Sequence, residues 1–335
     1  MVTAYDVAAQ AGVSVGTVSR YLTGNGYVSE AARQRIAAAV AELGYIQNRA
    51  AASLTTKKTG LLGFVVSQLS NPFTAEVAAA LGDEARADGY GVVISDSNGD
   101  PDLAIQAITL LRSHDVDGLI VTPPESPAYN DALLAAARSI PVVGIGLRTN
   151  PMVTDLVSGD TRGGARLARS HLLALGHSRI AYVGGSNMAS GRFEGYRDSL
   201  TESGIEINAD LISLGTMDRE AGFNAVQRFL TQPAPVTAVF AANDALALGV
   251  LQGAHRLGVR VPQQLSVIGY DNVDMAVHAI PPLTTVAQNM VGMGRAAIRL
   301  LMDRLSGAAP AGEPRQVVLE STLVIRESCA EPAGQ

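Results

Sequence analysis

Residues 3–23 read TAYDVAAQAGVSVGTVSRYLT and carry the pattern of two short helices joined by a tight turn. Thr3 and Asp6 have the spacing of a capping box at the start of a helix. Gly12 can take the left-handed conformation that ends this first helix. Ser14 can then cap the helix that follows. The stretch therefore predicts a helix-turn-helix unit.

A shared apolar face is expected to hold these helices together. Ala8 is small enough to let the two helices approach closely. The apolar positions that fall where they meet are Val7, Ala11, Val13, Val18 and Tyr21. A third helix is expected from about Ser29 to Gly44. Its apolar face is formed by Ile36, Val40 and Leu43. An ordinary small helical bundle is the alternative, but caps, turn glycine and apolar positions coincide here and favour the helix-turn-helix.

The second helix is the candidate element for DNA recognition. In a helix-turn-helix unit it lies in the major groove, close to base edges and phosphates. The residues expected there are Val15, Gly16, Thr17, Ser19 and Arg20. The run Gly12–Gly16 also matches the G-x-S-x-G pattern of a hydrolase nucleophile. That pattern needs a strand before the serine, and because a helix precedes Ser14, the hydrolase interpretation is rejected.

The charge of the chain is unevenly distributed. Its formal net charge is −6. Residues 1–60 hold six lysines and arginines against three acidic residues, which gives +3, so the rest of the chain carries −9. A basic head on an acidic body is typical of a DNA-binding module attached to another domain.

Composition indicates a globular α/β protein. Hydrophobic residues make up 47% of the 335 residues and aromatic ones 4%, so small aliphatic side chains must fill the core. The longest apolar runs, such as Leu61–Val66, are too short to span a membrane. Cys329 is the only cysteine, which excludes an internal disulfide, and the N-terminal residues lack the pattern of a signal peptide. We therefore expect a cytoplasmic protein without membrane contact.

The alanine-rich segment 48–59 is about two helical turns long and joins the head to the body. A helix this short is unstable alone in water and could fold on a partner. Leu54 beside basic residues resembles an apolar wedge for a DNA minor groove. A plain flexible linker is the alternative interpretation.

From Leu61 onward, apolar strands alternate with amphipathic helices. The expected strands are Leu61–Ser67, Gly91–Ser95, Gly118–Thr122 and Pro141–Ile145, then Ile180–Gly184, Leu211–Leu214, Ala238–Ala242 and Ser266–Gly269. Such βαβ series form parallel sheets with helices on both faces. Two series of similar size predict two α/β units with a cleft between them.

Ligands of parallel sheets sit beyond the carboxyl ends of the strands, so polar residues there are candidates for binding. They are Ser67 to Phe73, Asp96, Asn98, Arg148, Asn187, Arg192, Asn243, Asp244, Asp271 and Asn272. A single polar residue at such a place is more often a cap or turn former than a ligand contact. Asp244, at a helix start, is expected to be a cap.

Signals for catalysis or metal binding are missing from the sequence. It has no phosphate-binding G-x-x-x-x-G-K-[ST] loop, no dinucleotide fingerprint after a strand and no H-E-x-x-H motif. The five histidines are scattered. We therefore expect no enzyme activity, no metal site and no cofactor. A secreted solute-binding protein would fit the body alone, but the basic helical head and the lack of a signal peptide argue against it.

The sequence resembles the lactose/galactose-repressor (LacI/GalR) family over nearly its whole length. In the head, the matching stretches are Tyr5–Ala8, Ala11–Ser14, Thr17–Arg20, Val28-Ser29, Leu43–Tyr45, Asn48-Arg49 and Ser53-Leu54. In the body they are Asn71–Phe73, Val116–Ile120, Leu175–His177, Arg179–Ala181, Ala242–Asp244, Ala247–Gly249, Gly269–Asp271 and Pro282–Thr285. Single pieces are weak, but the ordered set is highly specific.

The resemblance implies a small all-α helix-turn-helix headpiece and a periplasmic-binding-protein-like α/β domain of two Rossmann-like, parallel-sheet subdomains. The implied boundaries are 1–46 for the DNA-binding domain, 47–59 for a hinge helix or linker, 60–159 with 289–319 for the N-subdomain, and 160–288 with 320–335 for the C-subdomain. The implied function is a transcription repressor whose operator affinity is controlled by a small effector bound between the subdomains.

The implied macromolecular partner is double-stranded operator DNA, bound by a homodimer with one head on each half-site. The residues expected to contact DNA are Tyr5, Ser14, Val15, Gly16, Thr17, Ser19, Arg20, Thr23, Tyr27, Ser29, Asn48, Arg49, Ala51 and Leu54. Val15 and Gly16 depart from relatives with long polar side chains at these positions, and neither can make a bidentate base contact.

The implied effector is a sugar or related polyol, because carboxylate, amide and guanidinium groups suit hydroxyls that both donate and accept. The residues expected to bind it are Asn71, Phe73, Arg148, Met217, Arg192, Asn243 and Asp271. Gly146 stands where many sugar-binding relatives carry Asp, and Met217 stands where others carry a stacking aromatic residue.

Overall fold

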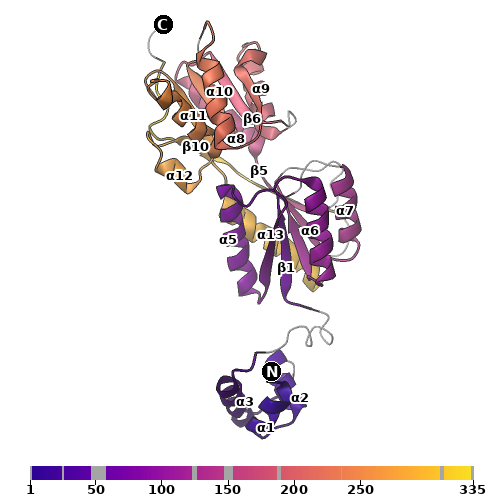
Figure 1. The fold of residues 1–335 in the computed structure, drawn as a ribbon. Helices are drawn as coiled ribbons and strands as arrows, with labels where there is room; N and C mark the ends of the chain where they lie inside the picture. The colour runs from indigo at the N-terminus through magenta and orange to yellow at the C-terminus, as the bar shows by residue number, and fades with distance from the viewer. Residues whose placement is uncertain are drawn as a thin grey trace. The chain divides into compact units, whose positions relative to one another are not determined.

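The computed structural model describes residues 2–24, 26–46, 58–122, 127–146, 154–186, 190–234, 236–309 and 313–332 (Figure 1). The chain divides into two compact units, which we call the head unit, Met1–Thr59, and the body unit, Gly60–Gln335. Of the expected hinge segment 47–59, residues 47–57 lie outside the described residues.

Within its described residues, the head unit contains three helices: α1 Ala4–Ala11, α2 Val15–Thr23 and α3 Glu30–Leu43. Thr3 and Asp6 form the predicted capping box, and the Ser14 hydroxyl accepts the Thr17 amide at the start of α2. Gly12 has a φ of +62°, the left-handed conformation expected for the turn. The small core is formed by Val7, Ala8, Ala11, Val18, Val28, Ala32, Ile36 and Ala39. The predicted helix-turn-helix is confirmed.

Two six-stranded sheets build the body unit and define its two lobes. Lobe A has the strand order β11-β5-β4-β3-β1-β2, and lobe B has the order β12-β10-β9-β8-β6-β7. Described neighbours are all parallel except β10 and β12. In lobe A, for example, Leu61 of β1 lies opposite Gly91 of β2.

The elements of lobe A are β1 Leu61–Val66, α5 Pro72–Ala87, β2 Gly91–Asp96, α6 Pro101–Ser113, β3 Gly118–Val121, α7 Pro127–Ala137, β4 Val142–Ile145, β5 Asp155–Gly159, α13 Met290–Ser306 and β11 Gln316–Leu319. Those of lobe B are α8 Thr161–Ala174, β6 Ile180–Gly185, α9 Gly191–Glu202, the 3-10 turn η1 Ala209–Leu211, β7 Ile212–Gly215, α10 Arg219–Leu230, β8 Ala238–Ala241, α11 Asp244–Arg256, β9 Ser266–Asp271, α12 Asp274–Val277, β10 Thr284–Ala287 and β12 Thr322–Val324.

Alternating side chains of β1 show how the sheet of lobe A is covered on both faces. Leu62 and Phe64 pack with α5 and α13 on one face, while Val65 packs with α6 and α7 on the other. In lobe B, one continuous core lies among the sheet and helices α8 to α11. This is the α/β architecture predicted from the sequence.

The chain crosses between the lobes three times, through Asp160, through Gln288 and Asn289, and through Glu320 and Ser321. The elements next to these crossings are β5, α13 and β11 in lobe A, and α8, β10 and β12 in lobe B. The periodicity of the sequence did not predict these six elements.

Asp155 of β5 binds to α13 and to the segment before β11, the two elements that return to lobe A. Its side chain is 1% exposed and lies 2.8 Å from Nη2 of Arg304 on α13 and 2.8 Å from Nη2 of Arg315 before β11. Burial alone would raise the pKa of Asp155, but the hydrogen bonds from both arginines hold it below its usual value.

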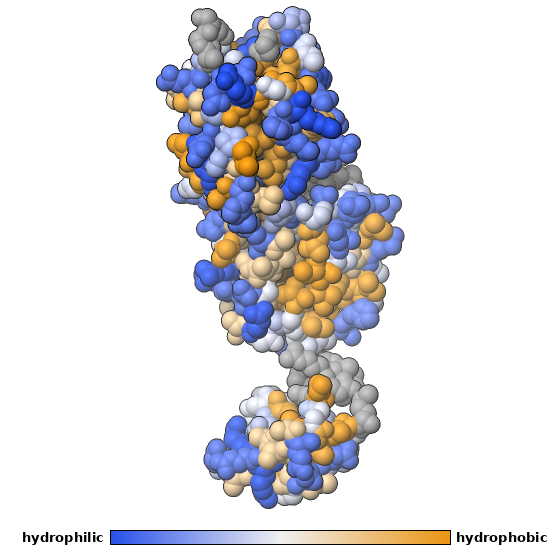
Figure 2. All heavy atoms as spheres, turned by 60° about the vertical axis from the view of Figure 1, so that its left-hand side comes forward, coloured by the Kyte–Doolittle hydropathy of each residue, from blue (hydrophilic) through white to orange (hydrophobic). Residues whose placement is uncertain are grey.

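Apolar areas also lie on the surface of the body unit, in orange in Figure 2. In lobe A, Val93 and Ile94 are exposed on β2, which is an edge strand. In lobe B, Met275 and Val277 on α12 are exposed, and Ile280 is 93% exposed. Exposed apolar groups of this kind mark candidate interaction surfaces.

Helices α10 and α11 touch through glycines. A Cβ on Gly249 would collide with the carbonyl oxygen of Arg219, and a Cβ on Gly222 with that of Leu246. Because both obstacles are backbone, neither can move aside as the end of a side chain could. Both positions therefore require glycine.

We predict that Gly249→Ala lowers the free energy of unfolding by about 1–3 kcal/mol, the usual cost of overpacking. Gly82→Ala is the control, because a Cβ on Gly82 in the interior of α5 has nothing within 4 Å. It should raise stability by up to ~1 kcal/mol through helix propensity. Urea denaturation of both variants measures this, and equal stability of the two would refute the close-packing account.

Candidate functional site

In the head unit, α2 presents a polar face to solvent. Val18 is buried against α1 and α3, which leaves Ser19, Arg20 and Thr23 exposed. Arg20 Nε donates to the carbonyl oxygen of Gly16 at 3.2 Å, so its stem lies along the helix. This face can offer hydroxyl and guanidinium donors to an anionic backbone or to base edges.

The structure gathers the predicted DNA contacts around the same helix. The hydroxyls of Ser14 and Thr17 form a hydrogen bond of 2.9 Å at the start of α2. Tyr5 and Tyr27 are strongly exposed, at 74% and 85%. Ser29 is the exposed N-cap residue of α3, without a side-chain capping bond. Asn48, Arg49, Ala51 and Leu54, also predicted to contact DNA, lie outside the described residues.

In the body unit, a cavity of about 750 Å³ opens between the two lobes. Lobe A lines it with Ser67, Gln68, Asn71, Phe73, Asn98, Gly99 and Gly146, which follow strand ends or begin α5. Lobe B lines it with Tyr182, Gly185, Ser186, Ser190, Gly191, Arg192, Gly215, Thr216, Met217, Asp218, Ala242, Asn243 and Asp271. The carboxyl ends of both sheets thus face one space, as expected for parallel sheets.

Asp271 is the most constrained polar group of this cavity. It is 3% exposed and ends β9, where its Oδ1 accepts Nε2 of Gln288 at 2.7 Å and Nη2 of Arg192 at 3.2 Å. Burial raises its pKa to about 6, and Arg192 and Gln288 limit the rise. The carboxylate is therefore largely desolvated yet held by two donors.

Arg192, at the start of α9, is fixed from three sides. Besides its contact to Asp271, Nη1 donates to the carbonyl oxygen of Ala242 at 2.6 Å, and its guanidinium lies 4.3 Å from the centre of the Tyr270 ring. A side chain held in this way is oriented before any ligand arrives.

Asn71 and Asn243 line the cavity and also cap helices. Oδ1 of Asn71 accepts the amide of Phe73, and Oδ1 of Asn243 accepts the amide of Leu246 at 2.8 Å. Nδ2 of Asn243 donates to the carbonyl oxygen of Met217 at 3.0 Å, which places Met217 in the cavity wall. Six of the seven predicted effector contacts therefore line one space; the seventh, Arg148, lies outside the described residues.

The prediction that Asp244 caps a helix is wrong. Asn243 is the N-cap of α11, and Asp244 is the first helical residue, fully buried. Its carboxylate accepts hydrogen bonds from Thr285 and Val273 instead. A sequence pattern cannot separate these roles, since Asn and Asp both favour helix starts.

Sequence reasoning missed the lining residues at the crossings: Gly159, Thr161, Gln288 and Met293. Gln288 leads from β10 to α13, and its side chain lies beside Gly159, where a Cβ would stand 2.7 Å from its Oε1. Strand-end rules could not find these residues because the crossing elements were not predicted.

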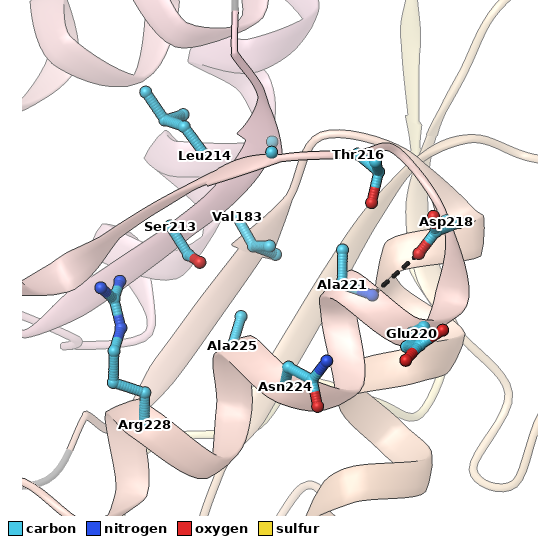
Figure 3. Close-up of a pocket in the computed structure, with 12 residues that line it drawn as sticks. Val183, Ser213, Leu214, Thr216, Asp218, Glu220, Ala221, Asn224, Ala225 and Arg228 are labelled. Carbon is cyan, nitrogen blue, oxygen red and sulfur yellow. Dashed lines mark hydrogen bonds between the residues drawn. The ribbon is translucent and has the colours of Figure 1, made fainter.

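A second groove of about 480 Å³ lies in lobe B between β6, β7 and α10 (Figure 3). Glu220, Asn224 and Arg228 are exposed in this groove. Asp218 caps α10, since its Oδ1 accepts the amide of Ala221 at 2.8 Å. A ligand in this groove would only replace water that these exposed groups already bind, so little binding free energy would be gained. The cavity between the lobes is therefore the stronger candidate for the binding site.

The described residues hold no group of three or more potential metal ligands. Within the described ranges, no helix is long and apolar enough to cross a membrane.

Comparison with known proteins gives two family matches. Residues 3–48 match the family described as "Bacterial regulatory proteins, lacI family", and residues 170–329 match a "Periplasmic binding protein-like domain". The chain is 34% identical to the ribose operon repressor of Haemophilus influenzae, over 98% of each chain.

Two solved structures are also similar. A complex of the transcriptional regulator CelR with cellobiose is 34% identical, with a TM-score of 0.72, covering 98% of this chain and 100% of that one. A Lac repressor dimer bound to operator and an anti-inducer is 32% identical, with a TM-score of 0.87, covering 98% and 99%.

Burial of Asp271 predicts a pH effect on stability. Its folded pKa of about 6 lies above the ~3.9 of an unfolded aspartate, so the folded state binds its proton more tightly. The contribution of Asp271 to the free energy of unfolding is most favourable below pH 4 and is lost as pH rises through 6. Asp271→Asn should therefore gain stability relative to the parent between pH 4 and 7. Urea denaturation at both pH values measures this, and a constant difference would contradict it.

Proposed function

The chain belongs to the LacI family of bacterial regulatory proteins, and from this premise we propose that it is a repressor whose operator affinity is set by a sugar or related polyol held between the lobes. The protein is a sequence-specific DNA-binding transcription regulator with an effector-binding domain. The effector class, the dimer and the residue roles given below are our proposal.

The observation that carries the effector proposal is the group of Asp271, Arg192 and Gln288 at the cavity wall. A sugar hydroxyl can donate to the carboxylate and accept from the guanidinium or amide, so adjacent hydroxyls match this set. Phe73 and Met217 add apolar surface for the C–H faces of a ring. One similar structure is a complex with cellobiose and one similar protein is a ribose operon repressor, which supports the same class.

Coupling to DNA would pass through lobe A. The lobes are joined by three crossings, so a ligand that contacts both favours one relative orientation. Lobe A begins at Gly60, whose amide donates to Asp117 at 2.9 Å and whose carbonyl accepts the amide of Gly91. A movement of lobe A would therefore also move Gly60, where the chain from the head enters the body unit. Effector binding and DNA binding would then influence each other as a reciprocal coupling between two sites.

A homodimer would cover the apolar surface of the body unit. Val93 and Ile94 lie on an edge strand, Met275 and Val277 lie on α12 of lobe B, and Ile280 follows that helix. An apolar strand edge that is exposed to water promotes association with another chain.

Two heads related by two-fold symmetry would bind a nearly palindromic operator, one head on each half-site.

We predict that Arg20→Ala weakens binding to the best operator that the protein selects from a random duplex library. One lost base or phosphate contact should cost roughly 5- to 150-fold, and wild-type affinity should fall steeply with salt. Fluorescence anisotropy measures the affinity, and sedimentation of the complex should give two chains per duplex. Arg86→Ala in lobe A is the control for lost charge. Wild-type affinity in Arg20→Ala would refute the role of α2.

We predict that a sugar or polyol raises the melting temperature of the protein, and that Arg192→Met strongly reduces this shift. The variant leaves the buried Asp271 without its cation, and loss of a charged hydrogen bond weakens binding at least about tenfold. Thermal shift assays with D-ribose, D-galactose, cellobiose, ribitol and adenosine test this.

The control is Arg197→Met, an exposed arginine of the same helix, which should keep the shift. A response to adenosine and to none of the carbohydrates would show that the proposed effector class is wrong.

A further inference from the structure

Asp244 is a buried carboxylate that lies behind the cavity wall. It is the first residue of α11 and is 0% exposed. Its Oδ1 accepts the hydroxyl of Thr285 at 2.6 Å, and its Oδ2 accepts the amide of Val273 at 2.9 Å. It is not among the residues that line the cavity, so its partners are protein groups.

The strand that leads to Asp271 leaves room for this carboxylate. A Cβ on Gly269 would collide with Oδ1 of Asp244 and would lie 2.9 Å from Leu283 Cδ2. Gly269 lies two residues before Asp271 in β9. A side chain at this position would push the carboxylate away from the strand.

The turn that Asp244 reaches has unfavourable backbone geometry. Asp271 has a φ of +114° and Asn272 a φ of +60°, which residues with a Cβ rarely adopt. Such a conformation persists only where its surroundings hold it. Arg326 Nη2 holds Asn272 by donating to Oδ1 at 2.6 Å, and Asp244 holds the amide of Val273 directly afterwards.

We propose that Asp244 is a positioning residue for effector recognition, which holds the turn over residues 271–273 so that the carboxylate of Asp271 faces the cavity. This rests on the proposed function, in which Asp271 binds the effector. Asp244 links α11, β10 and the turn after β9, and none of these contacts requires a ligand.

The charged surroundings give this role a pH signature. Burial and the neighbouring Asp271 raise the pKa of Asp244 to about 7. Four other charged groups lie around the turn. Arg192 reaches Asp271, Arg326 reaches Asn272, the charge of Glu76 raises the pKa of Asp271, and Asp274 begins α12 directly after Val273. An ionised carboxylate accepts hydrogen bonds more strongly than a neutral acid. Because the pKa of Asp244 is raised, its ionisation lowers the stability of the folded state as a whole, but it strengthens the hydrogen bonds that this carboxylate accepts. The turn is therefore held more firmly as pH rises through 7, and effector affinity should increase.

The test uses the full-length protein with Asp244→Asn and Thr285→Val, and with the exposed Asp210→Asn as a matched control. D-ribose, D-galactose and cellobiose are the probes, titrated by calorimetry between pH 6 and 8. Hydrogen exchange at the Val273 amide is followed without any sugar.

Asp244→Asn should speed exchange at Val273 and weaken sugar binding by about tenfold, the effect of one lost buried charged hydrogen bond. It should also remove the rise in affinity centred near pH 7 and leave only the change from Asp271 near pH 6. Asp210→Asn should match the wild type in all three measurements.

Wild-type affinity and a wild-type pH profile in Asp244→Asn would overturn the proposal. If that variant fails to fold, Thr285→Val decides by the same measurements, since it removes one hydroxyl and keeps the shape. If no sugar binds the wild type, the carbohydrate effector is refuted, whereas unchanged exchange at Val273 in Asp244→Asn would separately refute the holding role of Asp244.

Discussion

The three crossings between the lobes are the constraint on which the binding site depends. Each sheet is parallel apart from β12, so the carboxyl ends of its strands gather at one edge. Because the chain passes through Asp160, Gln288 and Ser321 at those edges, both sheets direct their polar loops toward the same space. A single crossing would leave the lobes free to turn away from each other, whereas three keep the two edges facing.

This arrangement explains how a buried acid is tolerated. Asp271 loses most of its hydration, which costs free energy, and donors from Arg192 and Gln288 offset part of that cost. Arg192 belongs to lobe B, while Gln288 belongs to a crossing. The environment of the acid is therefore sensitive to the relative orientation of the lobes, and a ligand that bonds to the acid acts on that orientation.

Much of the fold could be predicted from the sequence, and the exceptions have physical causes. The capping box at Thr3, the turn at Gly12 and the buried face of the head depend on residues close together in the chain, so local patterns were sufficient. Strands β5, β10, β11 and β12 each begin with a polar residue and hold only two or three apolar residues in a row, so no clear apolar run marks them in the sequence. Helix α8 was missed because its buried face consists of Gly164, Ala165, Ala168, Arg169 and Leu172, of which only Leu172 is a large apolar residue. Asp244 was misassigned because its partners, Val273 and Thr285, are distant in sequence.

The charged side chains of the cavity are concentrated on one lobe. Among the described lining residues, Arg192, Asp218 and Asp271 are charged, and all three belong to lobe B. Lobe A contributes neutral groups such as Gln68 and Asn71. Charged hydrogen bonds are about twice as strong as neutral ones, so a polyol should hold mainly to lobe B. Its weaker contacts to lobe A then supply only the small differential free energy that shifts one arrangement of the lobes toward another. Strong binding and modest coupling can thus be tuned separately, by changing residues on different lobes.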